Sequence, residues 1–155
     1  MVSSENGCRR MKSISRTGGE IPASRDEVWA VVSDPARNTE WVPWHDRWLR
    51  EPAAPVTRGR GILEQVTVFG STHTIEWTVT DWTPPQAIRL AAVGQHGLSM
   101  VFVTRVDPVD ESRCAVTFEL ALDGPVLEQV PIDAIESAVG AEFETALAQL
   151  EKLMS

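Results

Sequence analysis

The amino-acid sequence predicts an α+β fold in which a curved antiparallel sheet of seven strands wraps around a long C-terminal helix, with two short helices after the first strand. Three features of the sequence predict this arrangement. Residues 25–34 place apolar side chains at helical spacing, residues 60–123 alternate apolar and polar side chains as strands do, and residues 127–155 return to helical spacing. Short turns join the strands, which favours an antiparallel meander.

The length and composition of the chain indicate one globular domain. With 155 residues, 43% of them hydrophobic and 23% charged, the chain can bury a core without dividing into two domains. We expect a flexible tail at residues 1–10 and a single domain at residues 11–155. No apolar run approaches the roughly 18 residues that a membrane-spanning helix needs.

The charge and the cysteine content indicate which partners and which cellular compartment to expect. The formal net charge is −8, and a nucleic-acid-binding surface needs clustered Lys and Arg that this chain mostly lacks. Cys8 and Cys114 stand in no metal-binding or redox spacing, and residues 1–16 contain no apolar segment of a secretory signal. These features favour a cytoplasmic protein and exclude nucleic acid from the expected partners.

The segment after the first strand contains the signals of two short helices. Ser24 and Glu27 have the spacing of a capping box, in which the serine accepts a helix-start N–H and the glutamate reaches back to the cap. Asp34 and Pro35 end this helix and start a second, because proline is tolerated at the first helical position. The second helix is expected to run into a loop at Pro43.

The strands between residues 60 and 81 predict which side chains face the interior. A two-residue turn at Gly70 and Ser71 is expected, because glycine supplies the positive φ of a tight turn. Such a turn pairs Val68 with His73, Val66 with Ile75, Glu64 with Trp77 and Ile62 with Val79. Most apolar side chains then share one face, and Glu64 and His73 turn inward with them.

The remaining segments complete the sheet and the long helix. A break at Pro84 and Pro85 precedes another strand, and the two strands that follow form a second hairpin. One face of that hairpin is expected to carry Met100, Phe102, Thr104, Val106, Cys114, Val116, Phe118, Leu120 and Leu122. The C-terminal helix has an apolar stripe at helical spacing, formed by Ile132, Ile135, Val139, Phe143, Ala146, Leu150 and Leu153.

Three segments resemble the START-related superfamily, also called SRPBCC, which includes the pollen allergen Bet v 1, lipid-transfer domains and polyketide cyclases. They are "IPASRDEVWAVVSDPARNTEWVPWHDRW", "WTVTDWTPPQAIRL" and "FELALDGPVLEQVPIDAIESAVGAEFETALAQLEKL". The resemblance covers nearly everything from Lys12 onward and implies the helix-grip fold. Within the superfamily, the pattern formed by Glu40, Trp41, His45 and Trp48 most resembles a bacterial subgroup labelled polyketide cyclase or toxin.

The resemblance implies an internal cavity between the sheet and the C-terminal helix, of the kind that holds lipids, sterols, hormones or polyketide intermediates. Its expected apolar lining is Val66, Ile75, Trp77, Val79, Met100, Phe102, Phe118, Val139 and Phe143. Walls with few polar groups favour affinity gained by burial. Our first hypothesis is therefore a module that binds a hydrophobic or aromatic small molecule.

A second hypothesis is a cyclase or aromatase that needs no cofactor. Glu64 as general base and His73 as proton donor are the catalytic candidates, because an inward carboxylate in a dry pocket suits proton transfer. The alternative is that Arg105 or a neighbouring strand satisfies Glu64, while His73 lies near the solvated end of its hairpin. No metal site is expected, since His45, His73 and His96 have no ligand-like spacing.

A third hypothesis is a toxin-like regulatory protein that acts through a partner protein. Such a protein would expose an apolar patch, and no segment of the sequence identifies one. A homodimer is also compatible with the sequence, through a sheet edge or through the long helix.

Three tryptophans crowd around His45, and we expect different positions for their rings. In the helix-grip fold this segment is expected at the cavity mouth. Trp41 is expected to anchor the second helix against the sheet, Trp44 and His45 to act as gate residues that contact ligand, and Trp48 to begin the next strand. The alternative is that all three rings pack in the core. An exposed Trp44 ring would favour the gate, whereas its full burial against the first helix would not.

Overall fold

The computed structural model describes residues 12–50, 57–68, 70–94 and 97–155, so the tail expected at residues 1–10 lies outside the described residues. Its strands are β1 Lys12–Ile21, β2 His45–Arg50, β3 Gly61–Val68, β4 Ser71–Thr83, β5 Ala87–Val93, β6 Ser99–Asp110 and β7 Arg113–Asp123. Its helices are α2 Arg25–Val32, α3 Asn38–Trp41 and α4 Ile132–Leu153, with 3-10 turns η1 Pro35–Arg37 and η3 Pro125–Gln129.

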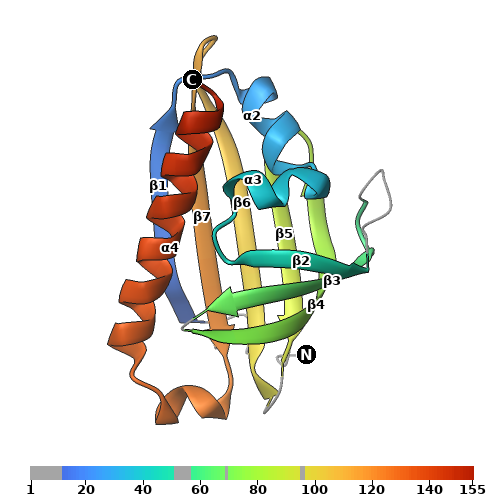
Figure 1. Ribbon diagram of the computed structural model, residues 1–155, viewed down its shortest axis with the longest axis vertical. Coiled ribbons are helices and arrows are strands. Elements are labelled where there is room, and N and C mark those ends of the chain that lie inside the picture. The colour runs from blue at the N-terminus through green and yellow to red at the C-terminus, as the bar shows by residue number, and fades with distance from the viewer. Residues whose placement is uncertain (1–11, 51–56, 69, 95–96) are drawn as a thin grey trace, which may run out of the picture.

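The strands form one antiparallel sheet of seven strands in the order β1-β7-β6-β5-β4-β3-β2. Strands β2 to β7 follow one another as a meander, and β1 pairs with β7 at the far edge. Figure 1 shows β2, β3 and β4 turning across the direction of β5, β6 and β7, so that the sheet curves around an interior. The predicted curved, seven-stranded antiparallel sheet is confirmed.

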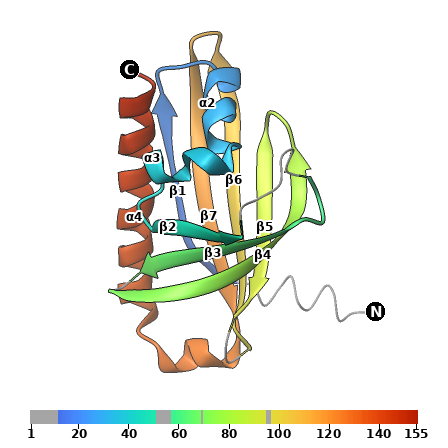
Figure 2. The ribbon, with the colours of Figure 1, turned by 45° about the vertical axis from the view of Figure 1, so that its right-hand side comes forward.

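The helices cover the concave side of this sheet. Helix α4 runs along β1 and β7, while α2 and α3 lie over the other end of the interior, as Figures 1 and 2 show. The segment from α2 to α3 also carries the chain from β1 at one sheet edge to β2 at the opposite edge. The two predicted short helices after the first strand therefore form the connection between the two edges of the sheet.

The predicted capping box is present at the start of α2. The Ser24 hydroxyl accepts a hydrogen bond from the Glu27 backbone N–H at 3.2 Å, and the Glu27 carboxylate accepts one from the Ser24 backbone N–H at 3.1 Å. Asp34 accepts a hydrogen bond from the Ala36 N–H at 3.1 Å and so caps η1, with Pro35 in its first turn. Both helix starts follow from local sequence alone.

Helix α4 is buried in its C-terminal half and only partly covered in its N-terminal half. Phe143, Ala146 and Leu150 are buried, whereas the apolar side chains at positions 132, 135 and 139 are partly exposed. Leu153, expected in the buried stripe, is 38% exposed near the end of the helix. In the described part of the chain, no helix has both the length and the apolarity needed to cross a lipid bilayer.

The pairing of β3 with β4 differs from the predicted register by two residues. The observed pairs are Val68 with Ser71, Val66 with His73, Glu64 with Ile75 and Ile62 with Trp77. The turn thus lies one residue earlier than predicted and contains Gly70, whose φ is +75°. Because side chains alternate between the two faces, a shift of two residues leaves every side chain on its predicted face. Glu64 therefore points inward in the observed register, as it did in the predicted one.

Two apolar clusters share the concave face. One joins the helices to β6 and β7 and includes Val28, Trp41, Phe118, Phe143 and Leu150. The other joins β3, β4 and β5 through Ile62, Trp77, Val79 and Ala92. Phe102 packs against both clusters, so the interior is continuous from α4 to the β3–β4 hairpin. The predicted common face of β6 and β7 is confirmed by pairs such as Phe102 with Leu120.

Ser24→Ala is expected to lower the free energy of unfolding by about 1 kcal/mol, because α2 loses its N-terminal cap. Hydrogen bonds from Ser24 lower the pKa of Glu27 below its ordinary value of 4.5. The stabilisation is therefore present above that ordinary value and is lost as the pH falls through the lowered one. Urea unfolding should show a larger deficit at neutral pH than in acid. Ser137→Ala, at an exposed position of α4, is the control, and an equal deficit in both variants would contradict the cap.

Candidate ligand-binding site

Aromatic rings occupy much of the space between the sheet and α4. The Phe118 ring of β7 contacts the rings of Trp41, Phe102 and Phe143 at centroid distances of 5.7, 6.2 and 5.6 Å. The Trp44 ring lies edge-on to Phe102 and Phe143, 5.7 Å from each. Edge-on and offset ring contacts at these distances stabilise packing. We call these five side chains the aromatic cluster; it joins the sheet to α3, to α4 and to the start of β2.

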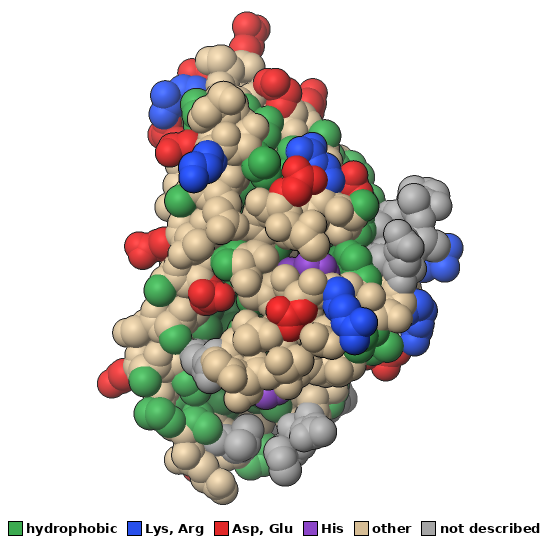
Figure 3. All heavy atoms as spheres, viewed as in Figure 1, with side chains coloured by type: hydrophobic (Ala, Val, Ile, Leu, Met, Phe, Trp, Pro, Cys, Tyr) green, Lys and Arg blue, Asp and Glu red, His purple; other side chains and the backbone are tan. Residues whose placement is uncertain are grey.

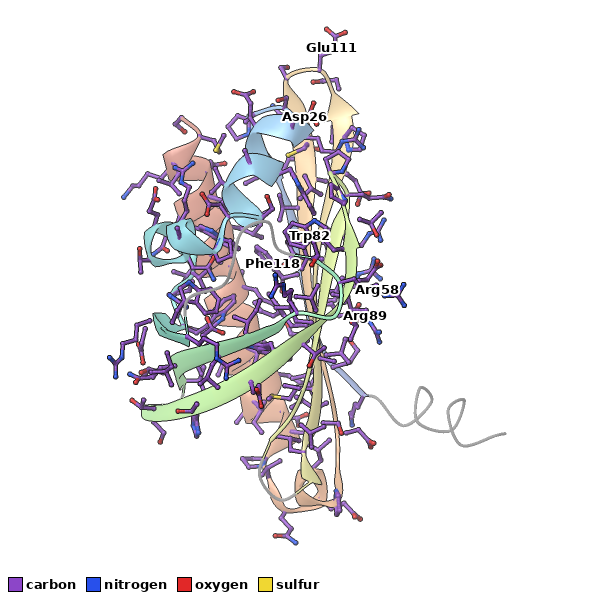
Figure 4. The ribbon with its side chains drawn as sticks, turned by 90° about the vertical axis from the view of Figure 1, so that its right-hand side faces the viewer. Asp26, Arg58, Trp82, Arg89, Glu111 and Phe118 are labelled. Atoms are coloured by element: carbon purple, nitrogen blue, oxygen red, sulfur yellow. The ribbon has the colours of Figure 1, made fainter. Side chains whose placement is uncertain are left out.

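Figure 4 shows this interior from the side. Phe118 and Trp82 lie in the space between the helices and the sheet, whereas Arg58 and Arg89 point away from it. The Trp82 ring lies beneath α2 and packs edge-on against Trp29 at 5.6 Å. These two arginines therefore lie on the outside of the sheet, while large apolar rings line the inside.

Several apolar side chains on the concave face are only partly buried. Phe102 lies on β6, between β5 and β7, and its ring packs against both apolar clusters, yet the residue remains partly exposed. Trp44, Met100, Leu120 and Val139 are also partly exposed. Protein interiors are close-packed, so a side chain at the centre of a filled core would be fully buried. These positions therefore leave part of their apolar surface open to solvent.

The apolar residues predicted to line the cavity are either buried or partly exposed in the structure. The buried ones are Val66, Trp77, Val79, Phe118 and Phe143. The partly exposed ones are Trp44, Ile75, Met100, Phe102 and Val139. These partly exposed side chains offer the apolar surface, and the buried ones support it from behind. Contact of any of them with a ligand stays a prediction.

A buried polar group lies beside this apolar surface. His45 Nδ1 is 2.5 Å from Glu64 Oε2, and Trp77 Nε1 donates a hydrogen bond to Glu64 Oε1 at 2.9 Å. The side chains of His45 and Glu64 are 1% and 5% exposed. A buried carboxylate is costly unless hydrogen bonds compensate for the lost water. Here each carboxylate oxygen has a nitrogen partner, so the group is held in one orientation.

The strand pairing and two ring contacts position His45. Antiparallel pairing of β2 with β3 sets His45 opposite Val66 and Trp48 opposite Glu64. The His45 ring packs against the Trp48 ring at 4.6 Å, and Trp48 Nε1 donates a hydrogen bond to the Pro35 carbonyl at 2.8 Å. The imidazole is therefore fixed from two sides, by Glu64 and by Trp48.

Two buried nitrogens have no hydrogen-bond partner among the described residues: Nε2 of His45 and Nε1 of Trp41. Most buried polar atoms in proteins are paired, and an unpaired one costs about 1–3 kcal/mol. Trp41 is the last residue of α3 and His45 the first of β2, so both nitrogens flank the short connection between these elements.

The predicted catalytic pair is not brought together. His73 pairs with Val66 on β4 and so keeps its predicted face, but it is exposed and not enclosed in a dry pocket. The histidine that contacts Glu64 is His45. The alternatives that His73 lies near the solvated end of its hairpin and that a neighbouring strand satisfies Glu64 are confirmed, the second by His45 of β2 and Trp77 of β4. Arg105, the other partner considered for Glu64, lies beside Asp107.

The three tryptophans have different positions, as expected. Trp41 is buried and stacks on Phe118, which confirms that it anchors α3 against the sheet. Trp48 lies inside β2 rather than at its start, because β2 begins at His45. Trp44 is partly buried, with its ring against Phe102 and Phe143. Trp44 is thus neither exposed nor fully buried, and its role as a gate residue stays a prediction.

The pairing of His45 with Glu64 was missed by sequence reasoning for a specific reason. Strand β2 has two irregularities in its pairing with β3, one after His45 and one after Trp48. A register cannot be counted across such irregularities, because each changes which residues face each other. The sequence did contain one signal for this strand: residues 45–50 precede the β3–β4 hairpin in the chain, so they can pair with the outer side of β3 as an edge strand.

The site offers no arrangement for a metal ion in the described part of the chain, where no three His, Cys, Asp or Glu side chains gather suitably. Cys114 is fully buried in β7, and burial raises the pKa of its thiol. A raised pKa disfavours the thiolate that a nucleophile or metal ligand requires. Cys114 is therefore a core residue.

Glu64→Ala is expected to lower the free energy of unfolding by about 3 kcal/mol or more, because two buried donors, on His45 and Trp77, lose their acceptor. Trp77→Phe keeps an aromatic side chain but removes one hydrogen bond to a charged group and part of a buried ring, and a loss of about 1.5–3 kcal/mol or more is expected. Glu76→Ala, at an exposed position on β4, is the control and should cost less than about 0.5 kcal/mol. Urea unfolding measures all three, and equal losses for Glu64 and Glu76 would overturn the assignment.

Known proteins resemble this chain in sequence and in structure. A protein of Mycobacterium tuberculosis named as a toxin is 29% identical over 108 residues, which cover 70% of this chain and 74% of the relative. A START superfamily protein of Mycobacterium smegmatis has a TM-score of 0.73 and 17% identity, covering 90% of this chain and 94% of its own. Norcoclaurine synthase of Thalictrum flavum, solved with dopamine and hydroxybenzaldehyde, has a TM-score of 0.66 and 14% identity, covering 94% of this chain and 88% of its own.

These likenesses show the helix-grip fold shared by START and Bet v 1-like proteins, and they confirm the fold that the sequence predicts. The match to a protein family covers the chain from β1 to beyond the end of α4, so it includes every strand of the sheet and every helix described above. Residues 12–155 match the family described as polyketide cyclase / dehydrase and lipid transport, and the chain belongs to this family.

Proposed function

We propose that the protein binds a hydrophobic or aromatic small molecule between the concave face of the sheet and α4. The observation that carries the proposal is the partial exposure of Phe102, an apolar ring at the centre of that face. The family description, which names lipid transport and cyclases, supports a ligand of this kind. Norcoclaurine synthase, with the same fold, was solved with aromatic molecules.

The chemistry of the site suits a mainly apolar ligand with one polar end. A ligand that covers the exposed parts of Trp44, Met100, Phe102 and Val139 gains about 25 cal/mol for each Å² of apolar surface removed from water. Ligand sites of this type combine apolar walls with a few polar groups that orient the ligand. His45 supplies such a group at the end of β2 nearest the aromatic cluster.

The N-terminal half of α4 is the route by which we expect a ligand to enter. Figure 3 shows apolar side chains gathered along this half of the helix and beside the ends of β3 and β4. Ile132, Ile135 and Val139 are partly exposed there, in contrast to the buried Phe143, Ala146 and Leu150 further along the helix. A ligand entering here would meet Phe102 and Trp44 next.

Val139→Trp is expected to weaken binding of a neutral aromatic probe, N-phenyl-1-naphthylamine, by about tenfold, which corresponds to roughly 1.4 kcal/mol. The larger ring would occupy space that the probe needs, because Val139 packs against the apolar cluster that joins the helices to β6 and β7. Probe fluorescence on titration measures the dissociation constant, and thermal unfolding checks that the variant is folded.

Ala141→Trp is the matched control, since it adds the same ring to an exposed position of the same helix. It should leave the dissociation constant unchanged. Equal weakening by both variants would contradict binding at the inner face of α4. No binding of the probe by the wild-type protein would count against the proposed function itself.

A second candidate function is proton-transfer catalysis of the cyclase type, and the contact of Glu64 with His45 favours it. In such a reaction a base removes a proton from a carbon between two carbonyl groups, and the resulting enolate attacks another carbonyl. We assign the base to Nε2 of His45, with Glu64 as the positioning residue. His73, the sequence-based candidate, is exposed and outside the interior.

Benzoylacetone in D₂O tests this assignment, because exchange of its methylene protons reports removal of an acidic C–H proton. The wild-type protein should accelerate the exchange, and His45→Gln should lose at least about tenfold of the acceleration, in line with general-base effects of roughly 10²–10⁴. His73→Ala should retain the rate. Proton NMR follows the methylene signal. Loss of rate in His73→Ala, or no acceleration by the wild type, would reject the assignment.

A further inference from the structure

We infer that the interior site prefers apolar ligands that carry a hydroxyl group over ligands of the same shape that can only accept hydrogen bonds. The inference rests on the proposed ligand-binding function and adds the chemistry of the ligand's polar end. It is carried by the hydrogen-bond chain from Trp77 through Glu64 to His45, which ends at a buried nitrogen without a partner among the described residues.

The chain of contacts determines where the His45 proton lies. The Trp77 indole N–H can only donate, so Glu64 Oε1 accepts its hydrogen bond. Glu64 Oε2 faces His45 Nδ1 within hydrogen-bond distance, and a hydrogen bond to an ionised carboxylate is charge-assisted. The proton of this bond lies on Nδ1, since a carboxylate only accepts. The hydrogen bond made by one ring nitrogen thus sets the state of the other.

Nε2 of His45 is therefore an acceptor. A neutral imidazole has one N–H, and Nδ1 holds it. A doubly protonated ring would bury a second, charged N–H donor at Nε2, where the described residues provide no partner. No described residue accepts a hydrogen bond from Nε2, so the contacts fit the ring with a single N–H, in which Nε2 carries a lone pair.

The lone pair on His45 Nε2 belongs to a residue next to the proposed ligand site. His45 lies on the same face as Val66, and its chain neighbour Trp44 contacts Phe102 and Phe143 in the aromatic cluster. A ligand hydroxyl can donate to the Nε2 lone pair, which has no partner among the described residues. An ether or ketone can only accept, so it would leave the His45 lone pair facing another lone pair.

Glu64→Gln should invert this preference. A glutamine amide has one oxygen, which the donor-only Trp77 N–H requires, and its NH₂ then faces His45 Nδ1. Nδ1 must accept, so the ring proton moves to Nε2 and turns that atom into a donor. The same substitution at the exposed Glu76 of β4 is the matched control, because it removes one charge nearby without touching His45.

Isothermal titration calorimetry with three naphthalenes of similar shape tests the inference. The probes are 2-naphthol, 2-methoxynaphthalene and 2-methylnaphthalene. For the wild type and for Glu76→Gln, 2-naphthol should bind about tenfold more tightly than 2-methoxynaphthalene, roughly the effect of one well-placed hydrogen bond. For Glu64→Gln, this preference should disappear or reverse, while 2-methylnaphthalene should bind all three proteins alike.

The outcomes separate this inference from the function on which it rests. Equal binding of all three probes by the wild type would leave the ligand-binding function in place and overturn the hydroxyl preference. Absence of binding by every probe would overturn both. If Glu64→Gln does not fold, ¹H–¹⁵N correlation spectra of the wild-type imidazole decide the matter: a protonated Nδ1 with an unprotonated Nε2 is expected, and a protonated Nε2 would overturn the inference.

Discussion

The contact of Phe118 with three other rings is the constraint on which the rest of the molecule depends. Phe118 lies on β7, beside both β1 and β6, and its ring meets Trp41 from α3 and Phe143 from α4. Sheet, connecting helix and long helix are therefore held by one buried residue. Because Trp41 is anchored there, the chain leaves α3 toward β2 in a fixed direction, and Trp44 and His45 follow it into the interior.

The polar part of the interior depends on this apolar framework. Glu64 can be buried because His45 and Trp77 reach it from the strands on either side, β2 and β4. Each partner is itself held by ring packing, His45 against Trp48 and Trp77 against Phe102. A buried carboxylate with fixed donors acts as an orienting group for the imidazole rather than as a mobile charge, which is why the open nitrogen of His45 has a defined hydrogen-bonding character.

The family relationship and the surface together favour function inside the fold. One relative is named as a toxin, which raises the question of a protein partner. In the described part of the chain, however, the large apolar side chains that are well exposed lie on four different elements, as Leu49, Val93, Val109 and Leu153. Single exposed apolar residues are normal on protein surfaces. The uncovered apolar surface that needs explaining lies between the sheet and α4.

The sequence by itself determined the local features of this protein. The capping box at Ser24, the alternation of the long strands and the apolar stripe of α4 depend on neighbours a few residues apart, and the order of these elements with the family resemblance was enough to predict the helix-grip fold. The inward side of Glu64 also followed, because a register error of two residues does not change the face. Only the tertiary structure decided that His45, and not His73, is the partner of Glu64. That contact joins an irregular edge strand to β3, and it depends on how far the sheet curves and where its hairpin ends, which no local pattern of residues specifies.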